Sequence, residues 1–434
     1  MDIPWVSIGR IFDFEGEVVE LRGWLANKRS SGKVAFLIVR DGSGFIQATA
    51  FVGNSFNKEQ LDEIKRVPIE SSIIVQGKVR KEERAPGGYE LEINSFQLIS
   101  PSEEYPIQKM EHSVDYLMEH RHLWLRSRKQ NALLRIRNIV IMSIHEFLQG
   151  EGFILLDSPI LTPAACEGTS TLFELQYFDI GKAYLSQSGQ LYMEAGATAF
   201  GKVYCLAPTF RAEKSKTRRH LTEFWMLEPE VAYYDWQDNM ILQENLVSFV
   251  VNQALKKCQN ELEILERDTV PLQKIQPPFP RISYTEAIEI LRKKGAPAQW
   301  GDDFGGDEET LISEDFDRPV FIHHYPAQIK AFYMQPDPEN PTMVLNDDLI
   351  APEGYGEIIG GSQRIHDLDL LEKRIEENHL PREAFEWYLD LRRYGTVPHS
   401  GFGLGIERTV AWIAGVKHIR EAIPFPRQIY RIYP

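Results

Sequence analysis

The strongest constraint on the fold is a change in the spacing of apolar residues near residue 100. From about Gly16 to Ser100, apolar and polar residues alternate in five short runs, which are separated by turn sequences such as Asp41-Gly42-Ser43-Gly44. A period of two is that of a strand with one buried face. Five strands within about 85 residues favour a small β-barrel over residues 1–100.

The rest of the chain mixes helical and strand-like patterns. Residues 126–150 place apolar side chains at helical spacing, and Gly150 and Gly152 end this run. Strand-like runs follow at 201–206, 222–233, 320–325 and 358–361, and helical runs at 239–264 and 368–378. The pattern predicts an α+β domain with an antiparallel sheet over residues 125–434. A polar, proline-containing stretch at 101–124 is interpreted as a linker.

Composition narrows the class of protein. The chain has 434 residues, 43% of them hydrophobic, and a net charge of −15, which excludes intrinsic disorder and disfavours nonspecific coating of nucleic acid. No run approaches the about 18 apolar residues of a membrane span, and the first residues do not resemble a leader, so we expect a cytoplasmic protein without membrane contact. Cys166, Cys205 and Cys258 are too few for a disulfide framework or a cysteine metal site.

Two segments carry chemistry. In the first, Phe210-Arg211-Ala212-Glu213 is followed by a basic stretch at 214–220 and by Glu223-Phe224, so a hairpin could present an arginine, a glutamate and an aromatic ring on one face. On its own this is more often a hairpin with a solvated tip. In the second, three alternating glycines at 401–405 precede Arg408 at a helix start, where an arginine can meet a phosphate. That spacing is neither a dinucleotide fingerprint nor a P-loop.

Together the motifs resemble a known family. Gly152-Phe153 with Ser158-Pro159-Ile160-Leu161, then the 210–224 hairpin, then the segment ending at Arg408 resemble, in order, the three signature motifs of class II aminoacyl-tRNA synthetases. The barrel is similar to the OB-fold anticodon-binding domain of the aspartyl, asparaginyl and lysyl branch, so the resemblance covers the whole chain. It implies a catalytic domain with a six-stranded antiparallel sheet flanked by helices, and a homodimer built around the first motif.

The resemblance also bears on the amino acid substrate. In aspartyl enzymes a lysine of the loop that closes over the substrate pairs with its carboxylate, and this chain has Met193 at that position. Aspartyl enzymes carry Asp where this chain has Glu228, whose longer carboxylate can accept from an amide and would repel aspartate. Arg364 matches the arginine that binds the side-chain oxygen in both families. These residues favour L-asparagine.

The implied reaction joins asparagine to ATP, releases pyrophosphate, and transfers the amino acid to the 3′ end of a tRNA. By resemblance Arg211 holds the α-phosphate and the attacking carboxylate, and Arg408 holds the γ-phosphate. The other implied ATP contacts are Glu213, Phe224 and His220, and the implied Mg²⁺ ligands are Glu357 and Asp348, although Gly360 replaces a serine of the aspartyl enzymes. Implied substrate contacts are Glu167, Ser188, Gln190 and Tyr333.

In the barrel, Phe36 and Gln47 fall where the family stacks and hydrogen-bonds the middle anticodon uridine. Without the resemblance, Phe36 would be interpreted as a core residue of a strand. Arg29 and Lys28 are expected to meet the RNA backbone. The sequence does not indicate what contacts the third anticodon base.

Four alternatives have the same motifs in common. A compact nondiscriminating aspartyl enzyme is disfavoured by Met193 and Glu228. A long bacterial aspartyl enzyme is excluded because this chain has no room for the inserted domain of such enzymes between Glu230 and Leu345. A catalytically inactive paralogue is disfavoured because the arginines and glutamates of the motifs are intact. An ammonia-dependent, asparagine-making paralogue would have no use for the barrel.

Overall fold

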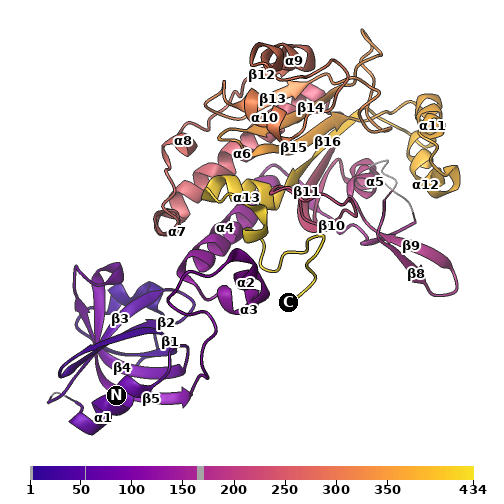
Figure 1. Ribbon diagram of the computed structural model, residues 1–434. Helices are drawn as coiled ribbons and strands as arrows, with labels where there is room; N and C mark the ends of the chain where they lie inside the picture. The colour runs from indigo at the N-terminus through magenta and orange to yellow at the C-terminus, as the bar shows by residue number, and fades with distance from the viewer. Residues whose placement is uncertain (1–2, 54, 164–170) are drawn as a thin grey trace. The chain divides into compact units, whose positions relative to one another are not determined.

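The computed structural model describes residues 3–53, 55–163 and 171–434 (Figure 1). Contacts within the chain divide it into two compact units, residues 1–113 and 114–434. No helix in these described ranges is long and apolar enough to span a membrane.

The first unit is a closed five-stranded barrel, as the alternation predicts, with the strand order β1-β2-β3-β5-β4. Its strands are β1 (Val18–Ser31), β2 (Val34–Arg40), β3 (Phe45–Phe51), β4 (Ser72–Lys81) and β5 (Tyr89–Ser100), accompanied by helix α1 (Lys58–Arg66) and 3₁₀ turns η1 (Ile8–Phe14) and η2 (Pro86–Gly88). On β2, Ala35, Leu37 and Val39 are buried in the barrel core. Because side chains alternate along a strand, Phe36 lies on the outer face.

The second unit is built on an eight-stranded sheet with the order β12-β13-β14-β15-β16-β11-β10-β6. The strands are β6 (Ile154–Leu155), β10 (Lys202–Phe210), β11 (Glu223–Ala232), β12 (Arg281–Ser283), β13 (Val320–His323), β14 (Asn346–Ala351), β15 (Gly356–Gln363) and β16 (His399–Gly405). The six central strands are antiparallel, as expected, whereas β12 and β6 add parallel pairs at the two edges. A small sheet contains β7 (Leu161–Thr162), β8 (Glu174–Tyr177) and β9 (Gly181–Leu185).

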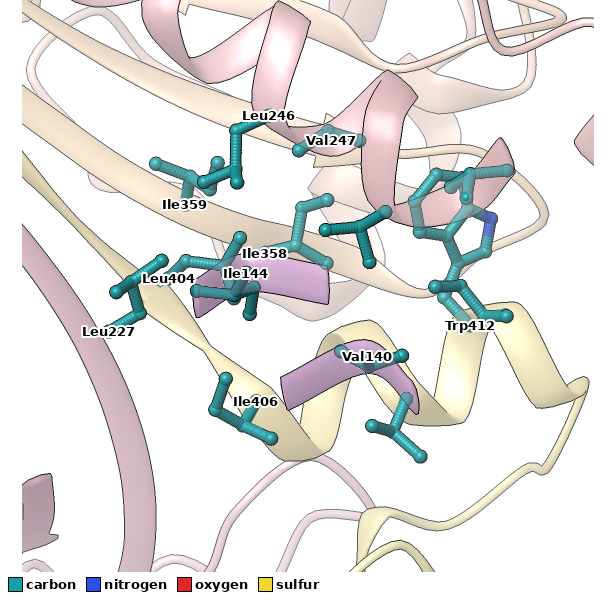
Figure 2. Close-up of a cluster of buried hydrophobic side chains, with 14 of the residues drawn as sticks. Val140, Ile144, Leu227, Leu246, Val247, Ile358, Ile359, Leu404, Ile406 and Trp412 are labelled. Atoms are coloured by element: carbon teal, nitrogen blue, oxygen red, sulfur yellow. The ribbon is translucent and has the colours of Figure 1, made fainter. Parts of the chain in front are cut away.

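Helices α4 (Arg128–Gly150), α6 (Trp236–Lys257) and α13 (Ile406–Ala414) pack on one face of this sheet. Figure 2 shows side chains from these helices and the sheet pointing into one apolar layer, among them Ile144, Leu246, Trp412, Leu227, Ile359 and Leu404. The predicted helix at 239–264 is interrupted at Cys258, where α6 ends and α7 (Gln259–Ile264) begins.

The opposite face of the sheet carries α5 (Gln190–Phe200). Met193 and Ala197 of α5 pack on Val203 and Cys205, which alternate along β10 with the core residue Tyr204. The remaining helices are α8 (Val270–Gln273), α9 (Tyr284–Lys293), α10 (Gly306–Ser313), α11 (Leu368–Glu377), α12 (Arg382–Arg393) and the 3₁₀ turn η3 (Ile419–Glu421).

The segment interpreted as a linker is not without structure. It contains α2 (Val114–Glu119) and α3 (Arg121–Trp124), which belong to the second unit. Arg121 is buried and donates to the carbonyl oxygens of Glu421, Ile423 and Pro424 at 2.8 to 3.0 Å. Because these partners lie about 300 residues away and the two helices are short, periodicity along the segment does not reveal them.

Candidate active site

A cavity of about 560 Å³ opens over the ends of β11, β15 and β16, on the face opposite the apolar layer. All six residues that the family resemblance places around ATP line it: Arg211, Glu213, His220, Phe224, Glu357 and Arg408. They come from segments up to 197 residues apart, so folding alone brings them together. The cavity floor includes Gly403 and Gly405, where β16 leaves room beside β11.

Arg211 and Glu213 enter the cavity where β10 ends. The guanidinium of Arg211 lies 5.6 Å from the ring centre of Phe224. Within the described chain, Nε of Arg211 and Oε2 of Glu213 are buried and have no hydrogen-bond partner. A buried polar atom without a partner costs about 1–3 kcal/mol, so these atoms favour a ligand that supplies both an acceptor and a donor.

Arg408 and Glu357 form the other side of the cavity. Nη1 of Arg408 donates to the carbonyl oxygen of Glu357 at 2.7 Å and lies 3.6 Å from its carboxylate. Partial burial, together with the cations of Arg408 and Arg211, lowers the pKa of His220, so its ring is neutral at pH 7. Arg211, Arg408 and the neutral ring of His220 therefore offer N–H donors to the same cavity, which suits a polyanion.

The carboxylates of Glu357 and Asp348 both lie close to Gly360. A Cβ atom at Gly360 would lie 3.1 Å from Oε1 of Glu357 and 3.6 Å from Oδ1 of Asp348, so the missing side chain leaves a gap between the two carboxylates. Burial and the charge of Glu357 raise the pKa of Asp348 to about 6, although Lys330 donates to Oδ2 of Asp348 at 2.6 Å. Across residues 3–53, 55–163 and 171–434, no group of three His, Cys, Asp or Glu side chains is arranged as a metal site.

A second cluster, of buried polar residues, lies further along β11. It is centred on Glu228, two residues beyond Met226, which lines the cavity. There the buried carboxylate of Glu228 accepts from the hydroxyl of Ser188 and, at 2.7 Å, from the backbone N–H of Gly189. Met193 is 2% exposed and packs on Cys205, whose sulfur lies 3.6 Å from Oε2 of Glu228. The position that holds a lysine in aspartyl enzymes is thus an apolar neighbour of this cluster.

Arg364 is buried against Glu230, which follows Glu228 by two residues on β11. Its Nη2 donates to Glu230 at 3.0 Å and its Nη1 to Ser362 at 2.7 Å, and its guanidinium lies 5.4 Å from the ring centre of Tyr333. Although burial opposes its charge, Glu230 raises the pKa of Arg364 above its ordinary value. Of the substrate-site candidates, Ser188 contacts Glu228 and Arg364 contacts Tyr333, whereas Glu167 lies outside the described residues.

One polar network was not found by sequence reasoning. The fully buried carboxylate of Glu194 accepts from Arg392 at 2.7 Å, from His399 at 2.9 Å and from Tyr388 at 2.8 Å. Gln190, a predicted substrate contact, donates to it at 3.1 Å. Although burial opposes its charge, Arg392 and His399 hold the pKa of Glu194 below its ordinary value. The network therefore orients Gln190 within its helix.

On the outer face of the barrel, the three predicted anticodon contacts touch one another. The guanidinium of Arg29 lies 4.7 Å from the ring centre of Phe36, and its Nη2 is 3.3 Å from Oε1 of Gln47. Gln47 in turn donates to Glu90, at 3.2 Å, which the sequence did not single out. Lys28, which is half-buried, donates to the carbonyl oxygens of Lys65 and Val67 near the end of α1.

Comparisons with known proteins agree with this geometry. The family model described as tRNA synthetases class II (D, K and N) matches residues 113–429, and that of the OB-fold nucleic acid binding domain matches residues 19–99. The chain is 59% identical to the asparagine–tRNA ligase of Chloroflexus aurantiacus, over 100% of this chain and 99% of that protein. It is 56% identical to that of Symbiobacterium thermophilum over the full length of both.

A solved structure is similarly close. The crystal structure of asparaginyl-tRNA synthetase from Pyrococcus horikoshii complexed with asparaginyl-adenylate has a TM-score of 0.96 and 47% sequence identity, with 100% of both chains covered.

The geometry of the barrel face generates a prediction. Phe36→Ala removes a half-buried aromatic ring on the outer face. Stacking on such a ring is worth about 1–3 kcal/mol per base, so charging of tRNA should fall roughly ten-fold or more. Pyrophosphate exchange with ATP, which needs no tRNA, should stay near the wild-type rate. Both rates are measured on the same preparation.

The matched control is Trp5→Ala, which removes another contact between an aromatic ring and an arginine, Arg22, at 4.8 Å. It should leave charging near wild type. If Phe36→Ala lowered exchange and charging equally, Phe36 would serve the fold and not the RNA.

Proposed function

This chain belongs to the class II tRNA synthetases of the D, K and N group, and we propose that it is the asparagine-specific member, an asparagine–tRNA ligase. The observation that supports this specificity most directly is the buried cluster of Glu228, Glu230 and Arg364, beside which Met193 supplies no cation. A neutral carboxamide, with one acceptor oxygen and one donor NH₂ group, matches this set of charges.

The proposed reaction has two steps. An oxygen of the asparagine carboxylate attacks the α-phosphorus of ATP, the bond from that phosphorus to the bridging oxygen breaks, and pyrophosphate leaves. The 3′-terminal ribose hydroxyl of the tRNA then attacks the carbonyl carbon of the adenylate, and AMP leaves. Both reactants of the first step are anions, so the protein contributes chiefly by positioning them and by stabilising negative charge.

The ATP contacts follow from the cavity. Arg211 is proposed to bridge the α-phosphate and the attacking carboxylate, because its Nε has no partner within the described protein. Phe224 and Glu213 offer an aromatic face and a carboxylate oxygen to the adenine. Arg408 and His220, which also line the cavity, are proposed to contact the γ-phosphate and another phosphate, respectively. This arrangement fits an ATP that is bent within one cavity.

The proposal includes Mg²⁺ as a partner of ATP. Glu357 and Asp348 are the residues that would hold it, because two carboxylates with a gap between them are the hard oxygen donors that this ion uses together with phosphates. When bound, Mg²⁺ supplies positive charge that offsets the phosphate oxygens. Lys330 keeps one carboxylate oxygen of Asp348 paired.

The amino acid contacts follow from the second cluster. Arg364 is proposed to donate to the side-chain oxygen of asparagine, and Glu228 to accept from its NH₂ group. The α-ammonium group is assigned to Ser188, Gln190 and Glu167, and Tyr333 lies beside Arg364. An aspartate side chain would face the carboxylate of Glu228 with no second cation, which is costly in a site removed from water.

The tRNA is proposed to bind both units. Phe36 with Arg29 would stack on the middle anticodon base, and Gln47 would hydrogen-bond its edge, because Arg29 contacts both of the other side chains on the barrel surface. Single-stranded bases bind proteins through such combinations of aromatic rings and cations.

A homodimer is proposed from the surface around the first motif. Ile154, Leu155, Ile160 and Leu161 are each 42% to 44% exposed, and β6 is at an edge of the main sheet. Clustered apolar side chains beside an edge strand are typical of an interface between copies.

Sedimentation should therefore give twice the chain mass of 50.0 kDa, about 100 kDa. Ile160→Asp should shift the protein toward the single-chain mass at micromolar concentration, because a charge would be buried in the interface. The control is Met110→Asp, at an exposed apolar residue of the first unit. A wild-type protein of single-chain mass would contradict the dimer.

Pyrophosphate exchange tests the amino acid directly. With Mg²⁺ and ATP, exchange should be strong with asparagine and roughly 10⁴-fold weaker in kcat/KM with aspartate, because a site with mispaired buried groups can discriminate at about that level. Equal exchange with the two amino acids would identify a nondiscriminating aspartyl enzyme. An absence of exchange with either would identify an inactive paralogue.

A further inference from the structure

Arg219, the residue before His220, is among the residues that line the ATP cavity, but its guanidinium is engaged by other parts of the protein. Its guanidinium makes four hydrogen bonds to a layer behind that cavity. On α10, Nη1 donates to the carbonyl oxygen of Gly306 at 2.9 Å and to Glu309 at 3.1 Å, and Nη2 donates to the hydroxyl of Thr310 at 2.7 Å. The fourth bond reaches the carbonyl oxygen of Gly354 at 2.5 Å. Arg219 thus ties the basic loop to α10 and to the turn before β15.

Glu309 extends this connection to the cavity. The same oxygen, Oε2, that accepts from Arg219 also accepts from the backbone N–H of Glu357 at 3.0 Å. The carbonyl oxygen of Glu357 accepts from Arg408 on its other side. The peptide groups that flank Glu357 are therefore held from two directions, by Glu309 and by Arg408.

Gly356 makes this arrangement sterically feasible. Its φ of +77° is one that residues with a Cβ atom rarely adopt. A Cβ atom there would also collide with Oε2 of Glu309 and with Nη1 of Arg219. The chain enters β15 around a glycine because two charged side chains occupy the space beside it.

We propose that Glu309 and Arg219 are positioning residues for ATP, which hold Glu357, Arg408 and His220 in the arrangement that binds the β- and γ-phosphates. Glu309 is not among the residues that line the cavity, and Nη1 and Nη2 of Arg219, which does line it, already donate to protein acceptors. The side chains of Arg219 and Glu309 are only 11% and 12% exposed, so water competes weakly for their hydrogen bonds. This inference rests on the proposed function, in which those three residues contact ATP.

The chain offers a matched control in a second ion pair at the same turn. Arg267 donates to both carboxylate oxygens of Glu353, at 2.8 and 2.7 Å, and to the carbonyl oxygen of Ile413. It therefore anchors the turn before β15, as Arg219 does, but the described structure shows no hydrogen bond from this pair to Glu357. Loss of either pair should lower stability, whereas loss of the Glu309 pair alone should affect ATP.

The test is steady-state pyrophosphate exchange on the full chain, with ATP and asparagine varied in turn. Glu309→Ala and Arg219→Ala should each raise the KM for ATP about ten-fold or more, because small displacements of binding groups have effects of this size. The KM for asparagine should stay within about two-fold of wild type. Glu309→Gln, which keeps an oxygen for the N–H of Glu357, should recover most of the loss.

Two further measurements separate positioning from simple destabilisation. The double variant should be no worse than the worse single variant, because residues that act as a unit are not additive. Arg267→Ala and Glu353→Ala should lower the melting temperature while the KM for ATP stays within about two-fold of wild type.

The proposal is overturned if both alanine variants of the Glu309 pair keep the wild-type KM for ATP. It is also overturned if the two KM values rise together, or if the Arg267 pair raises the KM for ATP equally. Should the wild-type protein show no exchange with asparagine, the proposed function fails on its own. In that case the rise in melting temperature on addition of Mg²⁺ and ATP is measured for the same variants.

Discussion

The second unit depends on pairing buried arginines with carboxylates on one face of an antiparallel sheet. Arg364 is held by Glu230, Arg392 by Glu194, and Arg219 by Glu309. A buried charge without a partner costs several kcal/mol, so neither member of a pair can be buried unless the other member is present. Pairing also fixes each guanidinium in one direction. Pre-oriented positive groups suit a reaction in which two anions approach each other.

Glycine provides the space that these charges need. On β16, a Cβ atom at Gly401 would collide with the carboxylate of Glu230, and one at Gly403 would collide with Met226. The intervening residues, Phe402 and Leu404, pack in the apolar layer. One strand therefore supports the hydrophobic core with one face and leaves its other face open for charged groups. The alternating glycines are ambiguous as a sequence pattern, and the close approach of neighbouring side chains to β16 explains them.

Local patterns were sufficient to predict the parts of the molecule that depend on neighbouring residues. The barrel follows from its period of two. Arg211, Glu213 and Phe224 lie on a short hairpin whose pattern alone favours a solvated tip, and the resemblance to a known motif assigns them to the site; the structure brings the three into one cavity. What escaped prediction depends on contacts across long separations. Glu194 meets Arg392 and His399 about 200 residues away, and Glu309 meets Arg219 across 90 residues. No spacing along the chain reveals such pairs, and α2 and α3 are too short to show a period.

The central claim is that the charges around Glu228 and Arg364 select a neutral carboxamide, with no cation at Met193 to accept a carboxylate. Calorimetric titration with two non-hydrolysable adenylate analogues, the sulfamoyl adenosine derivatives of asparagine and of aspartate, tests it without any catalytic step. The account predicts that the asparagine analogue binds at least roughly a thousand-fold more tightly. Equal dissociation constants for the two analogues would contradict it.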